Sequence, residues 1–146
     1  MKPLRRKRSK HQQRDGAAAV EFAILTPLLF IIIAGTLEVC SAMFLQEALT
    51  VCAYEGARTA VQRKAKTAQV IARVEEVLDE RGIVDGDVQI TPDPETSVIF
   101  TPITVTVTAP TAGNTILPLQ GWYSWMGNLE FEADVAMVKE FSDVEE

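Results

Sequence analysis

Apolar residues dominate one stretch of the chain, residues 16–37, in which Glu21 is the only charged side chain. From Phe22 to Leu37 there are 16 residues without a charge, and small residues at positions 17–20 lengthen the apolar run. A helix needs roughly 20 apolar residues to cross the ~30 Å hydrocarbon layer of a bilayer. We therefore predict a transmembrane helix over residues 17–37. A carboxylate near the bilayer core costs on the order of 3 kcal/mol or more, so Glu21 is a candidate functional residue.

The helical pattern continues beyond the apolar stretch. No proline occurs between Glu38 and Gln62, and a stripe of residues recurs there at steps of three and four: Leu45, Leu49, Cys52, Gly56 and Ala60. A single helix over residues 17–62 would be about 69 Å long, more than twice the hydrocarbon thickness. We therefore expect residues 38–64 to extend the helix outside the membrane.

Three residues of this long helix bear on how it packs or bends. Gly56 and Ala60 are small enough to let another backbone approach closely, either from a partner chain or, the favoured interpretation, from the protein's own domain. Pro27 removes the backbone hydrogen bond to the Ala23 carbonyl and is expected to kink or loosen the membrane half. A loosened helix would suit a subunit that is drawn out of a membrane. The alternative is that the kink has no function.

The remainder, residues 65–146, predicts a small α+β domain. Apolar residues at helical spacing indicate an amphipathic helix over residues 67–81, namely Val70, Ile71, Val74, Val77 and Leu78, and Gly82 supplies its end. Apolar and polar residues then alternate in three strand-like segments, around residues 88–90, 103–109 and 129–137. Together, these segments predict an antiparallel sheet of three or slightly more strands that packs against the helix.

Residues 116–127 are too apolar for an ordinary loop and include both tryptophans of the chain. One interpretation, the favoured one, is a lid that folds back on the sheet edge. The other is a patch for a partner or a membrane interface, formed by Trp122, Tyr123 and Trp125, because Trp and Tyr favour both settings.

The net charge of −6 conceals two parts of opposite sign. Residues 1–16 hold seven Lys or Arg and one acid, a charge of +6, so −12 remains for the rest of the chain. The positive-inside rule places the basic leader in the cytoplasm and the acidic domain on the other side of the membrane. Nucleic acid is a disfavoured partner, because no aromatic residues are interleaved with the basic ones to stack on bases.

The sequence offers little for catalysis. Cys40 and Cys52 lie about 18 Å apart along one predicted helix and cannot bridge each other, which leaves free thiols or a bond to another chain. One histidine and two cysteines make no zinc cluster, and no nucleophile elbow or phosphate-binding loop occurs. We expect no enzymatic activity, no cofactor, no metal and no small-molecule substrate.

The junction Arg14-Asp15-Gly16-Ala17-Ala18-Ala19-Val20-Glu21-Phe22 resembles that of TadE-like minor pilins, pseudopilins of the tight-adherence (Tad, or Flp) pilus system and distant relatives of type IV pilins. In that class a basic leader ends in Gly, and the fifth residue of the mature chain is Glu followed by an aromatic residue. Phe22 stands where the major pilin has Tyr. The segment Ala53-Tyr54-Glu55-Gly56-Ala57-Arg58-Thr59-Ala60 resembles the EGAR segment of TadE-like helices.

The resemblance implies that a prepilin peptidase cuts after Gly16, so that the processing residues are Gly16, Ala17, Glu21 and Phe22. Cleavage would create an α-amino group at Ala17, about 6 Å along the helix from Glu21. The ammonium and the carboxylate could then neutralise each other, within one chain or between neighbours. The alternative is that Glu21 lies at the cytoplasmic interface and reaches the headgroups.

The predicted protein is a pilin-like, single-pass protein of the bacterial inner membrane with its head outside the cytoplasm, and it could also be incorporated into a pilus. The resemblance implies a non-enzymatic subunit that assembles with other pilins and pilus assembly proteins. The alternative is an uncleaved, signal-anchored envelope protein whose acidic head binds a protein partner.

Overall fold

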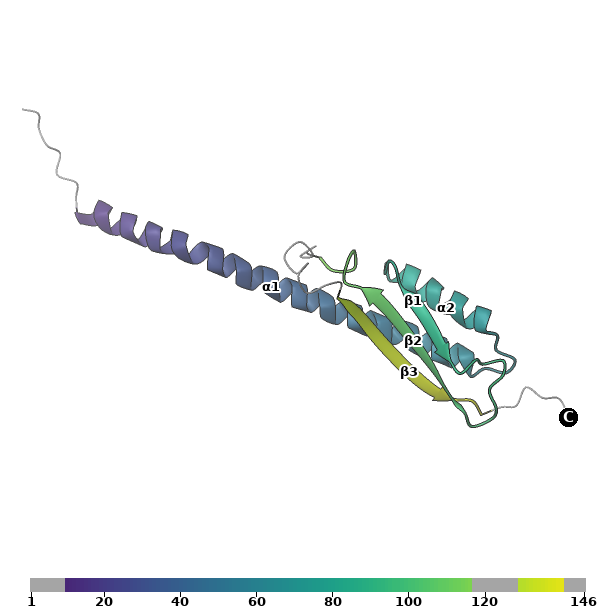
Figure 1. The fold of residues 1–146 in the computed structure, drawn as a ribbon. Coiled ribbons are helices and arrows are strands. Elements are labelled where there is room, and N and C mark those ends of the chain that lie inside the picture. The colour runs from purple at the N-terminus through teal and green to yellow at the C-terminus, as the bar shows by residue number, and fades with distance from the viewer. Residues whose placement is uncertain (1–9, 117–128, 141–146) are drawn as a thin grey trace, which may run out of the picture. The chain divides into compact units, whose positions relative to one another are not determined.

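The computed structural model describes residues 10–116 and 129–140, with side chains from residue 16 onward. Along the chain the elements are α1 (Lys10–Ala60), α2 (Thr67–Glu80), β1 (Asp87–Thr91), β2 (Pro102–Pro110) and β3 (Glu130–Val138) (Figure 1). The predicted α+β class is confirmed. The chain divides into two compact units, which meet in sequence between Leu37 and Glu38 and are described separately below.

Helix α1 begins earlier than the sequence pattern indicated. It starts at Lys10 rather than Ala17 and ends at Ala60 rather than Gln62. The residues before Gly16 are mostly good helix formers, and a single glycine costs a helix only about 1 kcal/mol relative to alanine, too little to end it. The helix also continues through Pro27 without interruption.

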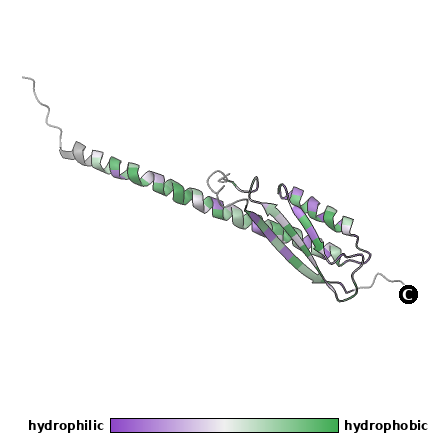
Figure 2. Ribbon diagram, in the orientation of Figure 1, coloured by the Kyte–Doolittle hydropathy of each residue, from purple (hydrophilic) through white to green (hydrophobic). Residues whose placement is uncertain are grey.

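In the first unit, residues 16–37 of α1 form an apolar rod. Its large hydrophobic side chains are exposed. Figure 2 shows that this part of the helix consists mostly of hydrophobic residues, drawn in green. The hydroxyls of Thr26 and Thr36 donate to the carbonyls of Phe22 and Ile32, at 2.7 and 2.8 Å, so these polar groups need no outside partner. Within the described residues, this is the one helix long and apolar enough to cross a membrane.

In the second unit, called the head here (residues 38–146), a three-stranded antiparallel sheet packs on the helices. The strand order is β1-β2-β3, and Val105 lies opposite both Ile90 and Val135. The inward side chains of β2 are fully buried, while its threonines are only partly covered. One face of the sheet therefore forms the core with α1 and α2, and the other face is exposed to solvent, as is common in antiparallel sheets.

Helix α2 covers the core as its apolar stripe predicted. Val70, Val74, Val77 and Leu78 are buried. The helix ends at Glu80. Gly82 follows with a φ of +67°, which suits a residue without a β-carbon, and the amides of Gly82 and Ile83 donate to the carbonyls of Asp79 and Leu78. The predicted helix boundaries differ from the observed ones by one residue.

Candidate functional site

The predicted processing residues lie together on one exposed stretch of α1. Gly16 has no heavy atom within 4 Å of the position that a β-carbon would take, and Phe22 is 65% exposed. Ala17 and Glu21 are four residues apart on the helix and therefore lie on the same side of it. The side chains from Gly16 to Phe22 are thus exposed in the isolated chain.

The Glu21 carboxylate is exposed in the isolated chain. Among the side chains that the structure describes, from residue 16 onward, none forms an ion pair with it. An amine created at Ala17, or a cation of another subunit, would be its first partner. The two interpretations of Glu21 both stay predictions.

The EGAR segment has a structural role in the head. Glu55 lies 4.0 Å from the Arg58 guanidinium and 3.8 Å from the Arg73 guanidinium on α2, and Arg73 also bonds Glu76 at 2.7 Å. The hydrogen bond with Glu76 is the main cause that raises the pKa of Arg73. Because these groups are partly exposed, the pairs contribute little energy. The pair of Glu55 and Arg73 shows that these sides of the two helices face each other.

Gly56 of the same segment lies where α1, α2 and the sheet meet. A β-carbon at this position would lie 2.5 Å from Val74 and 3.0 Å from Val105. Ala57 and Ala60 are fully buried as well. Gly56 and Ala60 therefore pack against the protein's own domain, and neither is exposed to admit a helix of another chain.

The two cysteines differ in environment. Cys40 is exposed, whereas Cys52 is fully buried in the core of the head. Burial raises the pKa of the Cys52 thiol, which is only partly offset by the charge of Arg81. An intermolecular disulfide, if one forms, requires Cys40.

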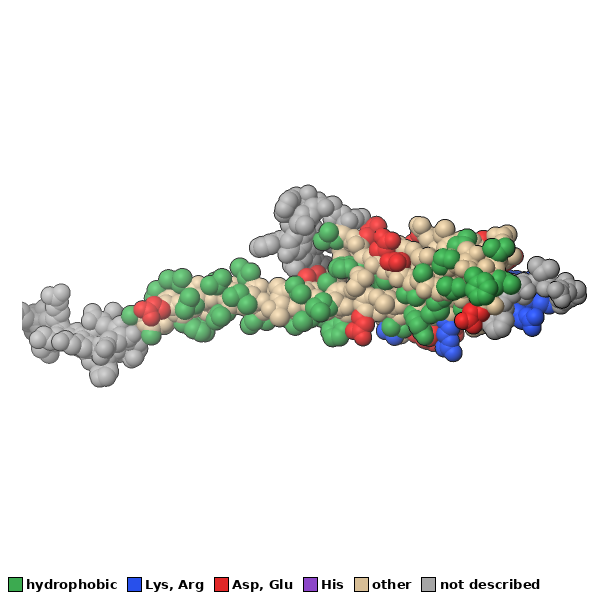
Figure 3. Space-filling model, turned by 90° about the horizontal axis from the view of Figure 1, so that it is seen from below, with side chains coloured by type: hydrophobic (Ala, Val, Ile, Leu, Met, Phe, Trp, Pro, Cys, Tyr) green, Lys and Arg blue, Asp and Glu red, His purple; other side chains and the backbone are tan. Residues whose placement is uncertain are grey.

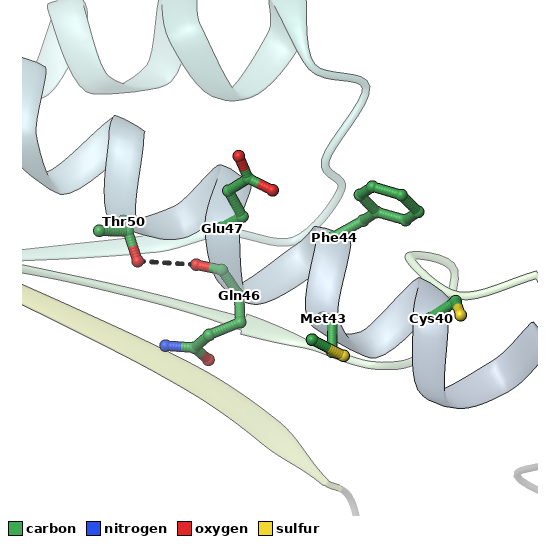
Figure 4. A pocket seen from close by; sticks show the side chains of 6 residues that line it. All are labelled: Cys40, Met43, Phe44, Gln46, Glu47 and Thr50. Carbon is green, nitrogen blue, oxygen red and sulfur yellow. Dashed lines mark hydrogen bonds between the residues drawn. The ribbon is translucent and has the colours of Figure 1, made fainter. Parts of the chain in front are cut away.

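Cys40 also belongs to an open apolar hollow of about 490 Å³ on α1, with Met43, Phe44, Gln46, Glu47 and Thr50 (Figure 4). The Gln46 side chain donates to the Glu132 carbonyl at 2.8 Å and so ties this part of α1 to β3. The described residues around the hollow bring together no acid, base and nucleophile. We assign no chemistry to it.

One loop of the head, around Asp93 and Pro94, was not predicted from the sequence. Asp93 accepts hydrogen bonds from the Thr67 hydroxyl at 2.7 Å and the Glu95 amide at 2.9 Å, and these bonds, the Thr67 bond above all, lower its pKa. Lys139 is 1% exposed and donates from Nζ to the Pro94 carbonyl at 2.8 Å. A signal for Lys139 existed, because it continues the inward-facing alternation of Val135 and Met137.

The predicted partner patch, Trp122, Tyr123 and Trp125, lies outside the described residues. It stays a prediction.

Comparison with known proteins identifies the N-terminal part of the chain. A family model described as TadE-like protein matches residues 16–58. This segment is TadE-like. The TadE-like match runs from the predicted processing glycine through the EGAR segment, and it confirms the resemblance read from both. The match suggests a Tad pilus-associated protein. The TadE-like family is a family of pilus components and is not known as enzymatic. Comparison of the chain with curated proteins and with solved structures found no match.

Proposed function

We propose that the protein is a minor pilin or pseudopilin of a Tad-type adhesive pilus, a non-enzymatic subunit that acts in assembly. The observation that carries the proposal is the TadE-like match over residues 16–58, which covers both the exposed apolar helix and the Glu21 junction. The remaining head supplies no catalytic constellation among its described residues.

The charge pattern supports the orientation. Seven cations precede the apolar run and the domain after it is acidic, so the leader stays in the cytoplasm and the head lies in the periplasm or outside the cell. A prepilin peptidase cuts after Gly16 on the cytoplasmic side. The product is a single-pass inner-membrane subunit whose chain begins at Ala17.

In this mature chain Glu21 serves assembly. Its exposed carboxylate pairs with the new amine of its own chain or of a neighbouring subunit, which removes most of the cost of burying either charge in the bilayer or in a filament. Glu21→Ala leaves insertion and cleavage largely intact, because insertion depends on apolar length. It disrupts association, because the amine loses its counter-ion.

The test compares recovery of pilus subunits that co-purify with the wild type, Glu21→Ala, Glu21→Gln and the control Glu47→Ala, an exposed carboxylate farther along the same helix. Glu21→Gln keeps size and hydrogen bonding but cannot neutralise an ammonium. We expect at least a tenfold loss for both Glu21 variants and none for the control. Unchanged recovery would make Glu21 a passive interfacial residue.

A second candidate function rests on the basic leader and the acidic head. In it the chain stays uncut as a signal anchor, with helix α1 continuous from Lys10 across the Gly16–Ala17 junction. From residue 38 onward the chain carries 18 acids against seven Lys or Arg, a charge of −11. In this candidate function the acidic head binds a protein partner in the envelope. An uncut chain in mature membranes would select this candidate.

A further inference from the structure

One side of α1 in the head stays apolar and exposed after the predicted membrane segment ends at Leu37. Val39, Met43 and Phe44, called the Phe44 face here, are 61%, 67% and 70% exposed. The buried Leu45 lies on the other side of the helix, which packs on the core of the head. Single exposed apolar residues are normal, but a contiguous group marks a contact surface.

The Phe44 face continues the surface that crosses the membrane. Helix α1 is one helix from Lys10 to Ala60, so Val39 follows the last residue of the predicted span by two positions. Between Phe22 and Phe44 the one charged residue is Glu38, and it is only partly exposed. Figure 3 shows hydrophobic side chains, drawn in green, along the exposed length of α1. Lipid that surrounds the span would therefore meet the same kind of surface on the Phe44 face.

The length of the apolar run points the same way. The 16 residues from Phe22 to Leu37 are about 24 Å long, which is short of the ~30 Å hydrocarbon layer. The predicted span of residues 17–37 reaches that thickness only with Glu21 inside the hydrocarbon. Extension of the run to Phe44 gives about 34 Å, enough to cross the layer at the average tilt of about 20° with Glu21 at its boundary.

The sheet exposes an apolar residue at the same end of the head. Strand β3 runs alongside α1 in the same direction, because Gln46 bonds Glu132 near the start of β3, and Val61 and Met137 line one groove near its end. Leu129 precedes Glu132 by three residues, about 10 Å along a strand, which corresponds to about six or seven residues of a helix. Leu129 is 44% exposed and so lies at the level where the Phe44 face begins.

The turn after β2 adds a second apolar residue here. The Thr111 amide donates to the Leu129 carbonyl at 2.9 Å, so this turn lies beside Leu129. Ile116, in the same turn, is 69% exposed. Helix and sheet thus both present apolar side chains at the end of the head where α1 enters it.

Charge favours lipid as the occupant of this surface. Acids border it, since Glu47 follows the Phe44 face on α1 and Glu130 begins β3 next to Leu129. From residue 38 onward the chain has a charge of −11, so a second copy would be repelled, whereas acyl chains carry no charge. The adjoining span also keeps this end of the chain beside the bilayer, which raises the effective concentration of lipid.

We propose that the Phe44 face, with Leu129 and Ile116, is buried in the bilayer leaflet nearer the head, at the level of the upper acyl chains. The membrane segment then ends at Phe44 rather than at Leu37, and the head is held on the bilayer surface instead of on a free helical stalk. The inference rests on membrane insertion of α1, but not on the pilus assignment or on cleavage after Gly16.

The test is spin-label accessibility in the full-length chain, reconstituted in vesicles of phosphatidylcholine. Cys40→Ser removes the exposed native thiol, and the buried Cys52 is kept. One labelled cysteine is then introduced in each chain, as Met43→Cys, Phe44→Cys or Leu129→Cys. The label reports collisions with oxygen, which is concentrated among acyl chains, and with a nickel chelate, which stays in water.

Two further positions calibrate the measurement. Phe30→Cys, in the middle of the span, marks lipid. Val98→Cys marks water and is matched in exposure, since Val98 is 73% exposed and Phe44 70%. Val98 lies between β1 and β2, at the opposite end of the sheet from Leu129. We expect at least fivefold fewer nickel collisions at 43, 44 and 129 than at 98, and oxygen collisions close to those at 30.

The possible failures are distinguishable. Nickel collisions at 43 and 44 equal to those at 98, with position 30 in lipid, would overturn this inference and leave the membrane span intact. Access of the chelate to position 30 as well would overturn both. Few collisions with either reagent at 43 and 44 would mean that protein covers the face, which also overturns the lipid contact. Spectral broadening that disappears on dilution with unlabelled chain would identify that protein as a second copy.

A charge placed on the face gives a second test. Phe44→Asp puts a carboxylate where lipid is proposed, so nickel collisions of a label at 43 should rise at least fivefold. Val98→Asp should leave them unchanged. Both variants should keep the melting temperature of the head in detergent, because Phe44 and Val98 are exposed. Unchanged nickel collisions at 43 in a folded Phe44→Asp chain would contradict the proposal.

Discussion

The position that a β-carbon would occupy on Gly56 lies 2.5 Å from Cγ2 of Val74. Helices α1 and α2 approach each other here without room for a methyl group, and Val105 of β2 closes the third side at 3.0 Å. The glycine of the EGAR segment is thereby explained by packing within the head.

Gly56→Ala should consequently destabilise the head. Overpacking a core typically costs about 1–3 kcal/mol, because side chains must leave their rotamers or the backbone must shift. The thermal unfolding of the full chain in detergent, followed by circular dichroism, measures the change. Gly35→Ala is the control, since its added methyl group meets nothing within 4 Å. Equal melting temperatures for Gly56→Ala and the wild type would show that the helices are not so closely packed.

The thiols should react at different rates. Cys40 is exposed, while Cys52 is buried and has a raised pKa, so less of it is thiolate at any given pH. A brief maleimide treatment of the folded chain at pH 7 to 8 should modify Cys40 and leave Cys52 unmodified until the protein is unfolded. Peptide mass spectrometry locates the label. Comparable labelling of both thiols in the folded chain would be inconsistent with the core described here.

The loop around Asp93 should lose stability in acid. The hydrogen bond from Thr67 and then that from the Glu95 amide lower the pKa of Asp93 in the folded state, so its contribution to stability is present above the unfolded pKa of about 3.9 and is lost as pH falls through the folded pKa. The melting temperature of Asp93→Asn should be below that of the wild type at pH 7. The difference should shrink below about pH 4.

The control for this prediction is Thr67→Val, which removes the hydroxyl that donates to Asp93. In chains that carry Thr67→Val, the melting temperatures with Asp93 and with Asp93→Asn should differ less, and this smaller difference should depend less on pH. A difference between wild type and Asp93→Asn that is the same at pH 7 and pH 3 would argue against a lowered pKa.

Much of the head could be predicted from local pattern. The apolar spacing over residues 67–81 identified α2 within one residue, and alternation located all three strands, because each element exposes one face to water and buries the other. The start of α1 could not be predicted in the same way. A lone glycine at position 16 resembles a boundary in sequence, yet the residues around it favour the helix enough to carry it back to Lys10.

The site was predictable only in part. The TadE-like resemblance could be predicted from the Gly16 to Phe22 motif, since every residue of the motif is local in sequence; cleavage at this junction stays a prediction. For Gly56, the sequence favoured close packing on the protein's own domain. It did not indicate which side chains come close, because Val74 and Val105 belong to other elements. The loop around Asp93 and Pro94 could not be predicted, because the residues that hold it, Thr67 and Lys139, lie 26 and 45 residues away in sequence.

The mass and N-terminus of the chain extracted from mature membranes test the central claim most directly. A minor pilin processed after Gly16 begins at Ala17, and its mass lacks the 16 leader residues. This is the result we predict, with Glu21 then fifth in the chain. A chain that begins at Met1 would contradict the assignment as a processed pilin. So would one that begins at Met43, because Cys40-Ser41-Ala42 would then be the small-x-small cut site of a conventional signal peptide.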